Sequence, residues 1–118
     1  MQLIMLKAKL HMARITAAQL DYHGSLTIDE DLMDAVGLLN HEKILVANVE
    51  NGKRFETYAI PGPRGSGTIC LNGAAAHKGA KGDRIIILCF AVMTPREAKT
   101  FKPKALVLDA RNKPVEFF

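Results

Sequence analysis

Short segments of β character, separated by turn residues, account for most of the 118-residue chain. Residues 43–49 (KILVANV) and 53–60 (KRFETYAI) flank the pair Asn51-Gly52. Both residues of this pair tolerate positive φ angles, which makes the pair a strong signal for a β-hairpin. We therefore expect two antiparallel strands here, within a mainly β fold.

Further strands are expected on both sides of this hairpin. Alternate side chains of residues 2–12 share a face: Leu3, Met5, Lys7 and Lys9 on one side, and Ile4, Leu6, Ala8 and Leu10 on the other. Residues 25–28, 68–73 and 104–110 also have the composition of strands, and the tail beyond them is expected to be irregular. Residues 83–93 (DRIIILCFAVM) form the most apolar segment, so we expect this strand to be buried, or nearly buried, on both faces.

Short helices are expected between the strands. Residues 29–39 (DEDLMDAVGLL) can form a helix in which Asp29 caps the first turn and Gly37 ends the last. Residues 74–82 favour a helical turn followed by a loop. A short helix and a loop thus precede both of the apolar segments 42–46 and 83–87. Two such half-units favour a small closed barrel, which leaves no strand edge exposed.

The totals favour one globular domain covering residues 1–118, with 48% hydrophobic and 24% charged residues. The formal net charge is +4, but the basic residues are interspersed with acidic ones and form no basic stripe, which argues against a nucleic-acid partner. No segment has the apolar length of a membrane span or the pattern of a secretion signal. Cys70 and Cys89 lie in apolar segments and are expected to be buried, reduced thiols, so we expect a cytoplasmic protein.

The sequence Tyr22-His23-Gly24-Ser25, directly before the strand at 25–28, has two interpretations. In the ordinary one, Gly24 and Ser25 form a turn. In the other, the Gly24–Ser25 peptide bond is itself reactive, because a serine hydroxyl can attack a neighbouring carbonyl when its surroundings activate it. The dipeptide alone does not decide between them.

Four motifs in fixed order favour the second interpretation: KLHMARIT (9–16), YHGSLTID (22–29), NGKRFETYAI (51–60) and LNGAAAH (71–77). Together they resemble the pyruvoyl-dependent aspartate 1-decarboxylase (aspartate α-decarboxylase) family, from about residue 3 to residue 110. The resemblance implies a small closed six-stranded double-psi β-barrel with short helices. It also implies a homotetramer with active sites between subunits, and production of β-alanine from L-aspartate for pantothenate and coenzyme A biosynthesis.

The resemblance further implies that the chain is made as an inactive proenzyme. Self-cleavage between Gly24 and Ser25 is expected to give a β chain of residues 1–24 and an α chain of residues 25–118. Ser25 is expected to become a covalently bound pyruvoyl group, which forms a Schiff base with aspartate and accepts electrons as CO₂ leaves. That role is the one pyridoxal phosphate has in other enzymes, so no pyridoxal phosphate is expected. The four histidines lack metal-ligand spacing, so no metal is expected either.

Roles for individual residues follow from the same resemblance. Tyr58 is expected to donate a proton to the decarboxylated intermediate, although a half-buried strand aromatic is the ordinary reading. Arg54 and Lys9 are expected to bind substrate carboxylates, and Thr57 to contact substrate and assist cleavage. On an ideal strand Thr57 and Tyr58 point in opposite directions, so both reach one site only if the strand is twisted or bulged.

The turn Asn72-Gly73-Ala74-Ala75 is expected to hold substrate or the oxyanion of cleavage through the Asn72 side chain and backbone N–H groups. His11 and Tyr22 are expected beside the site in supporting roles. His23 and Ala47 depart from residues common in the family, an acidic residue and a tryptophan respectively, and neither change affects the chemistry.

Two other functions remain open at this stage. A non-enzymatic β-barrel module would stay an intact chain without a ketone. A nucleic-acid binder would lose affinity steeply as salt rises.

Overall fold

Nine strands form one hydrogen-bonded sheet in the order β2-β6-β3-β5-β4-β7-β1-β8-β9. This arrangement comes from a computed structural model that describes residues 1–118. The strands are β1 (Leu3–Arg14), β2 (Ala17–Gln19), β3 (Ser25–Asp29), β4 (Lys43–Asn48), β5 (Arg54–Gly62), β6 (Ile69–Asn72), β7 (Arg84–Met93), β8 (Lys104–Leu108) and β9 (Pro114–Phe117). They contain about half of the residues, so the predicted mainly β fold is confirmed. No hydrogen bonds join the outer strands β2 and β9, and the closed six-stranded barrel stays a prediction.

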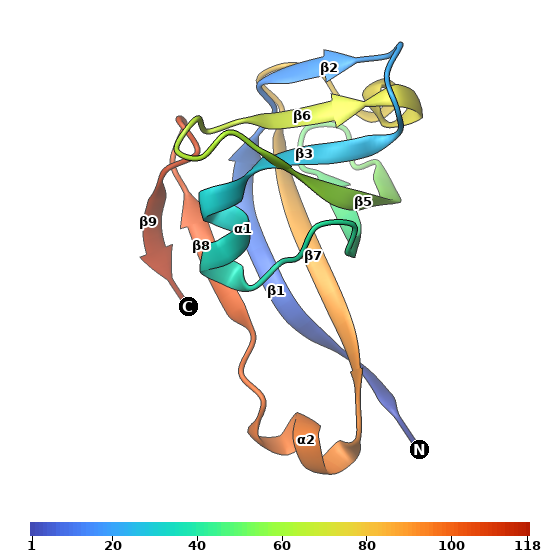
Figure 1. The fold of residues 1–118 in the computed structure, drawn as a ribbon, viewed down its shortest axis with the longest axis vertical. Coiled ribbons are helices and arrows are strands. Elements are labelled where there is room, and N and C mark those ends of the chain that lie inside the picture. Colours follow the sequence, from blue (N-terminus) through green and yellow to red (C-terminus); the bar gives the residue numbers. More distant parts are fainter.

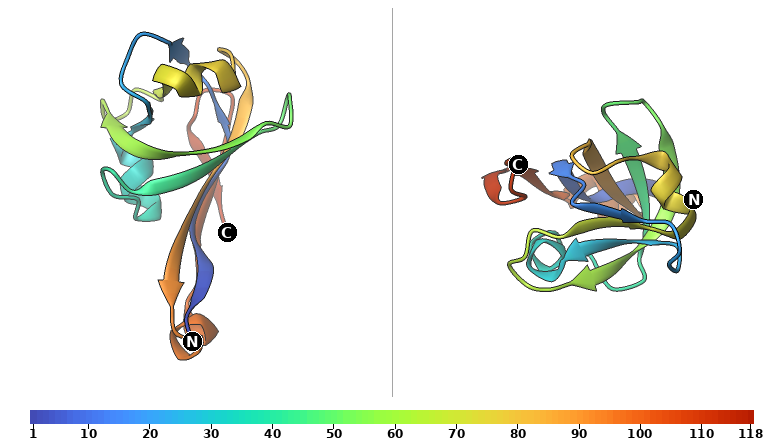
Figure 2. Two further views of the ribbon diagram at one scale, coloured as in Figure 1. Left: turned by 90° about the vertical axis from the view of Figure 1, so that its right-hand side faces the viewer. Right: turned by 90° about the horizontal axis from the view of Figure 1, so that it is seen from above.

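The shape combines a body with a long two-stranded arm (Figures 1 and 2). Strands β2, β6, β3 and β5 lie across one end of the molecule, and β1 and β7 run from there to the other end, where the N-terminus lies beside α2 (Pro95–Thr100). The longest dimension is 43 Å, against 28 and 25 Å for the other two. The arm therefore leaves the outer ends of β1 and β7 without a second layer of this chain.

The predicted hairpin is confirmed. Strands β4 and β5 pair antiparallel without a register shift, from Lys43 opposite Tyr58 to Ala47 opposite Arg54. The connecting loop contains Gly52 at a φ angle of 74°, where a side chain would strain the backbone. The regular pairing means that β5 keeps strict alternation of its side chains between the two sheet faces.

Strand β1 is less regular than its sequence suggests. Its register with β7 shifts between Leu6 and Ala8 and again between Leu10 and Ala13. These irregularities bend the strand and change which side chains share a face. Ala8 and Leu10 are buried, as expected for the apolar face.

The prediction that the strand at 83–93 is buried on both faces is wrong. Side chains of β7 alternate, and Ile85, Ile87 and Cys89 lie in the core, whereas Phe90 is 43% and Val92 62% exposed. The outer part of β7 belongs to the arm, which has no neighbour within the chain to cover that face. The tail is also more ordered than expected, because β9 pairs with β8.

Helix α1 begins and ends at the predicted signals. The Asp29 side chain accepts a hydrogen bond from the N–H of Asp31 at the start of α1 (Glu30–Val36), and Gly37 ends the helix in a left-handed conformation. The 3₁₀ helix η1 (Gly73–Lys78) forms where a helical turn was expected. None of the helices has the length and apolar character that a membrane span requires.

One hydrophobic core of 21 buried residues joins β1, β3, β4, β6, β7, β8 and α1. Its apolar burial is the main favourable contribution to folding. Cys70 and Cys89 are buried free thiols, as predicted. Burial raises the pKa of both, to about 12 for Cys89, so both stay protonated at neutral pH.

Candidate active site

Ser25 is the first residue of β3 and is buried. It is 1% exposed and lies directly opposite Asn72 of the antiparallel strand β6. The Asn72 side-chain N–H group donates a hydrogen bond to Ser25 Oγ at 2.9 Å. A second hydrogen bond, of 2.8 Å, runs from Asn72 Nδ2 to Thr27 Oγ1. The structure thus brings two predicted site residues into direct contact.

Gly24 and Gly73 lie against each other beside this pair. Gly73 has a φ angle of 64°, and a Cβ atom there would come within 2.6 Å of the Tyr22 carbonyl oxygen and 2.8 Å of Gly24 Cα. Only glycine allows this close approach of two backbones. At Gly24 itself a Cβ would meet nothing within 4 Å, so the space beside the Cα of the residue that precedes Ser25 is open.

A pocket of about 240 Å³ opens at Gly24. It is lined by Gly24, Phe55, Glu56, Thr57, Ala74, Ala75 and Lys78. Four of these, Gly24, Thr57, Ala74 and Ala75, are predicted site residues. The small alanine side chains at the start of η1 leave this space open, and its size suits a small metabolite.

Arg54 and Tyr58 lie on the opposite face of β5 from Thr57. The pairing of β5 with β4 has no register shift, so no bulge brings Thr57 and Tyr58 to one face of the sheet. Tyr58 is 37% exposed, and its ring centroid lies 5.9 Å from that of His41. Arg54 is exposed and forms no ion pair within the chain. Within one chain, these two side chains do not line the Gly24 pocket.

Lys9 and His11 form a third group, on β1 near the C-terminus. The ammonium group of Lys9 lies 5.9 Å from the centroid of the Phe118 ring, and the His11 ring meets the same ring edge-on at 6.5 Å. His11 Nδ1 is buried without a hydrogen-bond partner. Burial, and to a smaller extent the neighbouring Lys9 charge, lowers the pKa of His11 and favours its neutral form.

The sheet register separates Lys9 from the pocket. Lys9 aligns with Leu88, Leu88 with Leu45, and Leu45 with Glu56, across β1, β7, β4 and β5. Three strand spacings amount to about 14 Å along the sheet. Within the chain, Lys9 is therefore three strands away from the pocket along the sheet.

Tyr22, predicted in a supporting role, lies in the loop before Gly24. It is exposed, and its ring contacts that of His23 edge-on at 5.9 Å. Its backbone carbonyl, rather than its phenol, packs against the site at Gly73.

The sequence analysis missed three residues near the site: Thr27, Cys70 and Lys78. Thr27 and Cys70 face each other across β3 and β6, and each is two residues from a predicted site residue. The period of two along a strand places Thr27 on the face of Ser25, and Cys70 on the face of Asn72. That spacing was visible in the sequence, whereas the pairing of the two strands was not. Lys78, at the end of η1, had no comparable signal.

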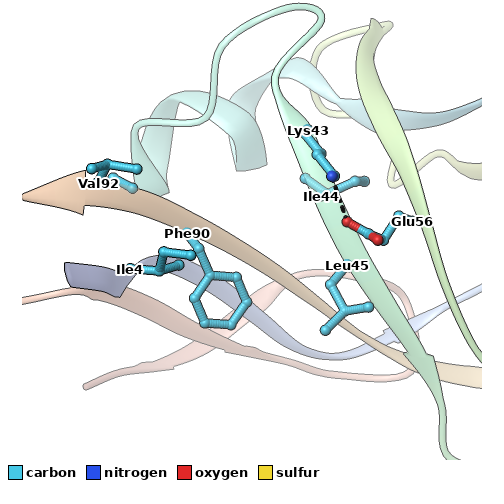
Figure 3. A pocket seen from close by; sticks show the side chains of 8 residues that line it. Ile4, Lys43, Ile44, Leu45, Glu56, Phe90 and Val92 are labelled. Carbon is cyan, nitrogen blue, oxygen red and sulfur yellow. Dashed lines mark ion pairs between the residues drawn. The ribbon is translucent and has the colours of Figure 1, made fainter. Parts of the chain in front are cut away.

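A larger hollow of about 360 Å³ lies on the outer surface, away from Ser25 (Figure 3). Ile4, Leu45, Phe90 and Val92 give it an apolar lining, and the Lys43–Glu56 ion pair of 2.7 Å borders it. Glu56 stands between Arg54 and Tyr58 on the outward face of β5. The apolar surface therefore adjoins the face that carries these two predicted site residues.

Comparison with known proteins identifies the family. A family model described as aspartate decarboxylase matches residues 1–115. Aspartate 1-decarboxylase of Shouchella clausii is 59% identical over 112 residues, covering 95% of this chain and 88% of the relative. Aspartate 1-decarboxylase of Thermoanaerobacter pseudethanolicus is 54% identical over 115 residues, with 98% of each covered. That of Bacillus licheniformis is 57% identical over 108 residues, covering 92% and 85%. The predicted resemblance is confirmed, and this chain belongs to the aspartate decarboxylase family.

Proposed function

We propose that this chain decarboxylates L-aspartate at C1, giving β-alanine and CO₂ for pantothenate and coenzyme A biosynthesis. Family membership and relatives that are named for this activity support the proposal. The observation that carries it is the setting of Ser25, a buried hydroxyl hydrogen-bonded to Asn72 and preceded by an unobstructed glycine. An ordinary surface turn would leave the serine exposed and solvated.

The chemistry begins with the chain's own backbone. Ser25 Oγ attacks the Gly24 carbonyl carbon, the new C–O bond replaces the C–N bond, and the hydroxyl proton passes to the released amine. Loss of the Ser25 Cα proton then expels the Gly24 carboxylate, which frees residues 1–24 and leaves dehydroalanine at position 25. Transfer of a proton to Cβ converts this enamine into an imine. Water replaces the resulting imine nitrogen, ammonia leaves, and residues 25–118 begin with a pyruvoyl group.

Position 25 fits such a group. Ser25 is buried beside a pocket that opens at Gly24, and Asn72 supplies one N–H donor to oxygen at that position. When present, the ketone would bind the substrate amine and accept the electrons that the departing CO₂ leaves behind. This is the chemistry for which other decarboxylases use pyridoxal phosphate, so neither that cofactor nor a metal is part of the proposal.

The other predicted residues bind aspartate and move a proton. Arg54 presents a planar guanidinium that can hold a carboxylate through two hydrogen bonds, and Lys9 adds a second cation. Thr57 and the turn from Asn72 to Ala75 border the pocket, where their hydroxyl and amide groups can contact the substrate. Tyr58 donates the proton that completes β-alanine.

These groups require a second subunit to meet at one site. Arg54 and Tyr58 lie on the opposite face of β5 from Thr57 and do not line the Gly24 pocket. Lys9 is three strand spacings, about 14 Å along the sheet, from Glu56 at the edge of that pocket. The adjoining apolar surface of Ile4, Leu45, Phe90 and Val92 is of the kind that subunits bury on assembly. We propose a homotetramer with active sites between subunits, in which each barrel closes as a six-stranded double-psi fold of one domain.

The proposed location is the cytoplasm. Two buried free thiols suit a reducing compartment, in which disulfides do not persist. The proposed partners are L-aspartate and further copies of the chain, with no role for nucleic acid or membrane.

Intact-mass measurement of the purified, denatured protein tests the proposal. We expect two species, residues 1–24 and residues 25–118, the larger one lighter by one ammonia than its unmodified sequence and reducible by borohydride. Ser25→Ala should stay full length and inactive, whereas Ser66→Ala, which changes an exposed serine, should cleave normally. An intact wild-type chain that still makes β-alanine would contradict the pyruvoyl mechanism.

A further inference from the structure

Four side chains form a small square on one face of β3 and β6, and all of them except the half-buried Thr27 are buried. Ser25 lies opposite Asn72, and Thr27 lies opposite Cys70, in a continuous antiparallel register. We infer that Thr27 and Cys70 are positioning residues, which fix the orientation of the Asn72 amide toward Ser25 and thereby speed cleavage. The inference rests on the proposed self-cleavage and assigns it two residues beyond those predicted from the sequence.

Every polar atom of the Asn72 side chain has a partner in this square. Nδ2 donates one hydrogen bond to Ser25 Oγ at 2.9 Å and the other to Thr27 Oγ1 at 2.8 Å. Oδ1 accepts a hydrogen bond from the Cys70 thiol, with Sγ at 3.3 Å. Asn72 is 1% exposed, so a lost partner is not replaced by bulk water.

The thiol is what distinguishes the two orientations of the amide. Hydroxyl groups donate or accept, so Ser25 and Thr27 can satisfy either the N–H₂ end or the oxygen of Asn72. A thiol donates through S–H and is a poor acceptor, so Cys70 favours the amide oxygen on its own side. Burial raises the pKa of Cys70 and keeps the proton on sulfur. With the oxygen held by Cys70, the N–H₂ end must face Ser25.

The chosen orientation favours the attacking form of Ser25. An N–H donor to Oγ stabilises the negative charge that develops on this oxygen as its proton leaves. The serine proton is then directed elsewhere, and the His23 carbonyl oxygen lies 3.5 Å from Oγ. A flipped amide would instead accept the Ser25 proton and offer no donor to the charged oxygen.

Paired variants of the full chain test each contact. Cys70→Ala removes the donor to Oδ1, and Cys70→Ser restores a donor of similar size. Thr27→Val removes the acceptor without changing shape, and Thr27→Ser restores it. Cleavage is followed as the loss of full-length chain by intact mass, together with the midpoint of thermal unfolding. Cys89→Ala, which removes the other buried thiol of the chain, is the matched control.

We expect Cys70→Ala and Thr27→Val each to slow cleavage roughly threefold to tenfold, as loss of one net hydrogen bond implies. Thr27→Ser and Cys89→Ala should cleave at nearly the wild-type rate. Cys70→Ser, whose hydroxyl can donate to Oδ1 but can also accept from a flipped amide, should cleave at a rate between those of the wild type and Cys70→Ala. Unchanged cleavage in both Cys70→Ala and Thr27→Val would overturn the inference while leaving the proposed function intact. Cleavage of Cys70→Ser as slow as that of Cys70→Ala would overturn the donor role of position 70. A wild-type chain that never cleaves would overturn the proposed function and this inference with it.

Discussion

The predicted site residues lie on two faces of the sheet that differ in burial and in whether their polar groups have partners. On the β3–β6 face, Ser25 and Asn72 are buried, and each polar side-chain atom has a partner within the chain. On the outward face of β5, Tyr58 is partly exposed, and the guanidinium of Arg54 has no ion-pair partner. The polar groups of the β3–β6 face are paired within one chain, whereas the β5 face presents a guanidinium without an ion-pair partner.

This difference matches two different tasks. The proposed cleavage at Gly24–Ser25 is an intramolecular reaction, so its groups can be held in place by the fold itself. Binding of aspartate requires groups that are free to pair with substrate carboxylates. We therefore expect variants of the β5 face to impair turnover without affecting cleavage, and variants of the β3 face to affect cleavage or folding first.

Tyr58→Phe separates the two faces most strongly. We expect normal cleavage but a fall in turnover of about a hundredfold to ten-thousandfold, because the phenol proton is lost while the ring remains. Steady-state β-alanine production, normalised to the amount of cleaved chain, measures this effect. Wild-type turnover in this variant would remove Tyr58 as the proton donor.

Asp29→Asn probes what holds the buried face in place. The carboxylate ends β3 and accepts hydrogen bonds from the N–H groups of Asp31, Gly65 and Gly67 at 2.9–3.0 Å. An amide cannot accept all three, and we expect the free energy of unfolding to fall by about 2–3 kcal/mol. Chemical denaturation measures the loss, and Asp34→Asn, at an exposed aspartate paired with Arg64, should cost less than about 1 kcal/mol.

The Asp29 carboxylate also makes the stability of the fold depend on pH. Burial alone would raise the pKa of Asp29, but three backbone N–H donors more than offset it and hold the pKa below its ordinary value of 3.8. Its contribution to stability is therefore complete above pH 3.8 and is lost as the pH falls through the lower, folded-state value. The stability gap between wild type and Asp29→Asn should narrow in that acidic range. A gap that stays constant there would argue against an ionised Asp29.

Arg54→Lys tests the free cation of the β5 face. Lysine keeps the charge but lacks the planar fork that binds a carboxylate through two hydrogen bonds, so we expect kcat/KM for aspartate to fall about tenfold. Cleavage should be unchanged. Arg64→Lys, in which the altered side chain pairs with Asp31 and Asp34 on α1, is the control and should leave kinetics unaltered.

Val92→Ser tests whether the surface beside β5 is an interface between subunits. Val92 is 62% exposed in one chain, so the stability of the isolated fold should hardly change. Assembly should weaken by about 1 kcal/mol per copy, because the buried apolar area falls. Sedimentation over a range of concentrations measures this, and Val115→Ser, on β9 and outside the apolar surface, should assemble like wild type. Identical behaviour of the two variants would place the interface elsewhere.

Much of the local structure was predictable because its signals act over a few residues. Asp29 and Gly37 mark the ends of α1, and Gly52 takes the positive φ angle that the turn between β4 and β5 requires. Among the site residues, the motif resemblance indicated Ser25, Asn72 and Thr57, and the structure brings all three close to Gly24. Exposure of Phe90 was not predictable, because an apolar strand reads the same whether or not another layer covers it.

The amino-acid sequence by itself determined the family, the β-rich composition, and the caps and turns that delimit each element. Only the tertiary structure decided that Thr27 and Cys70 hydrogen-bond to the amide of Asn72, and that Thr57 and Tyr58 lie on opposite faces of β5. The physical reason is range: a cap or a turn depends on neighbours in the chain, whereas the Asn72–Ser25 contact joins residues 47 positions apart. Such contacts depend on which strands pair and in which register, and the burial of the whole core selects that pairing.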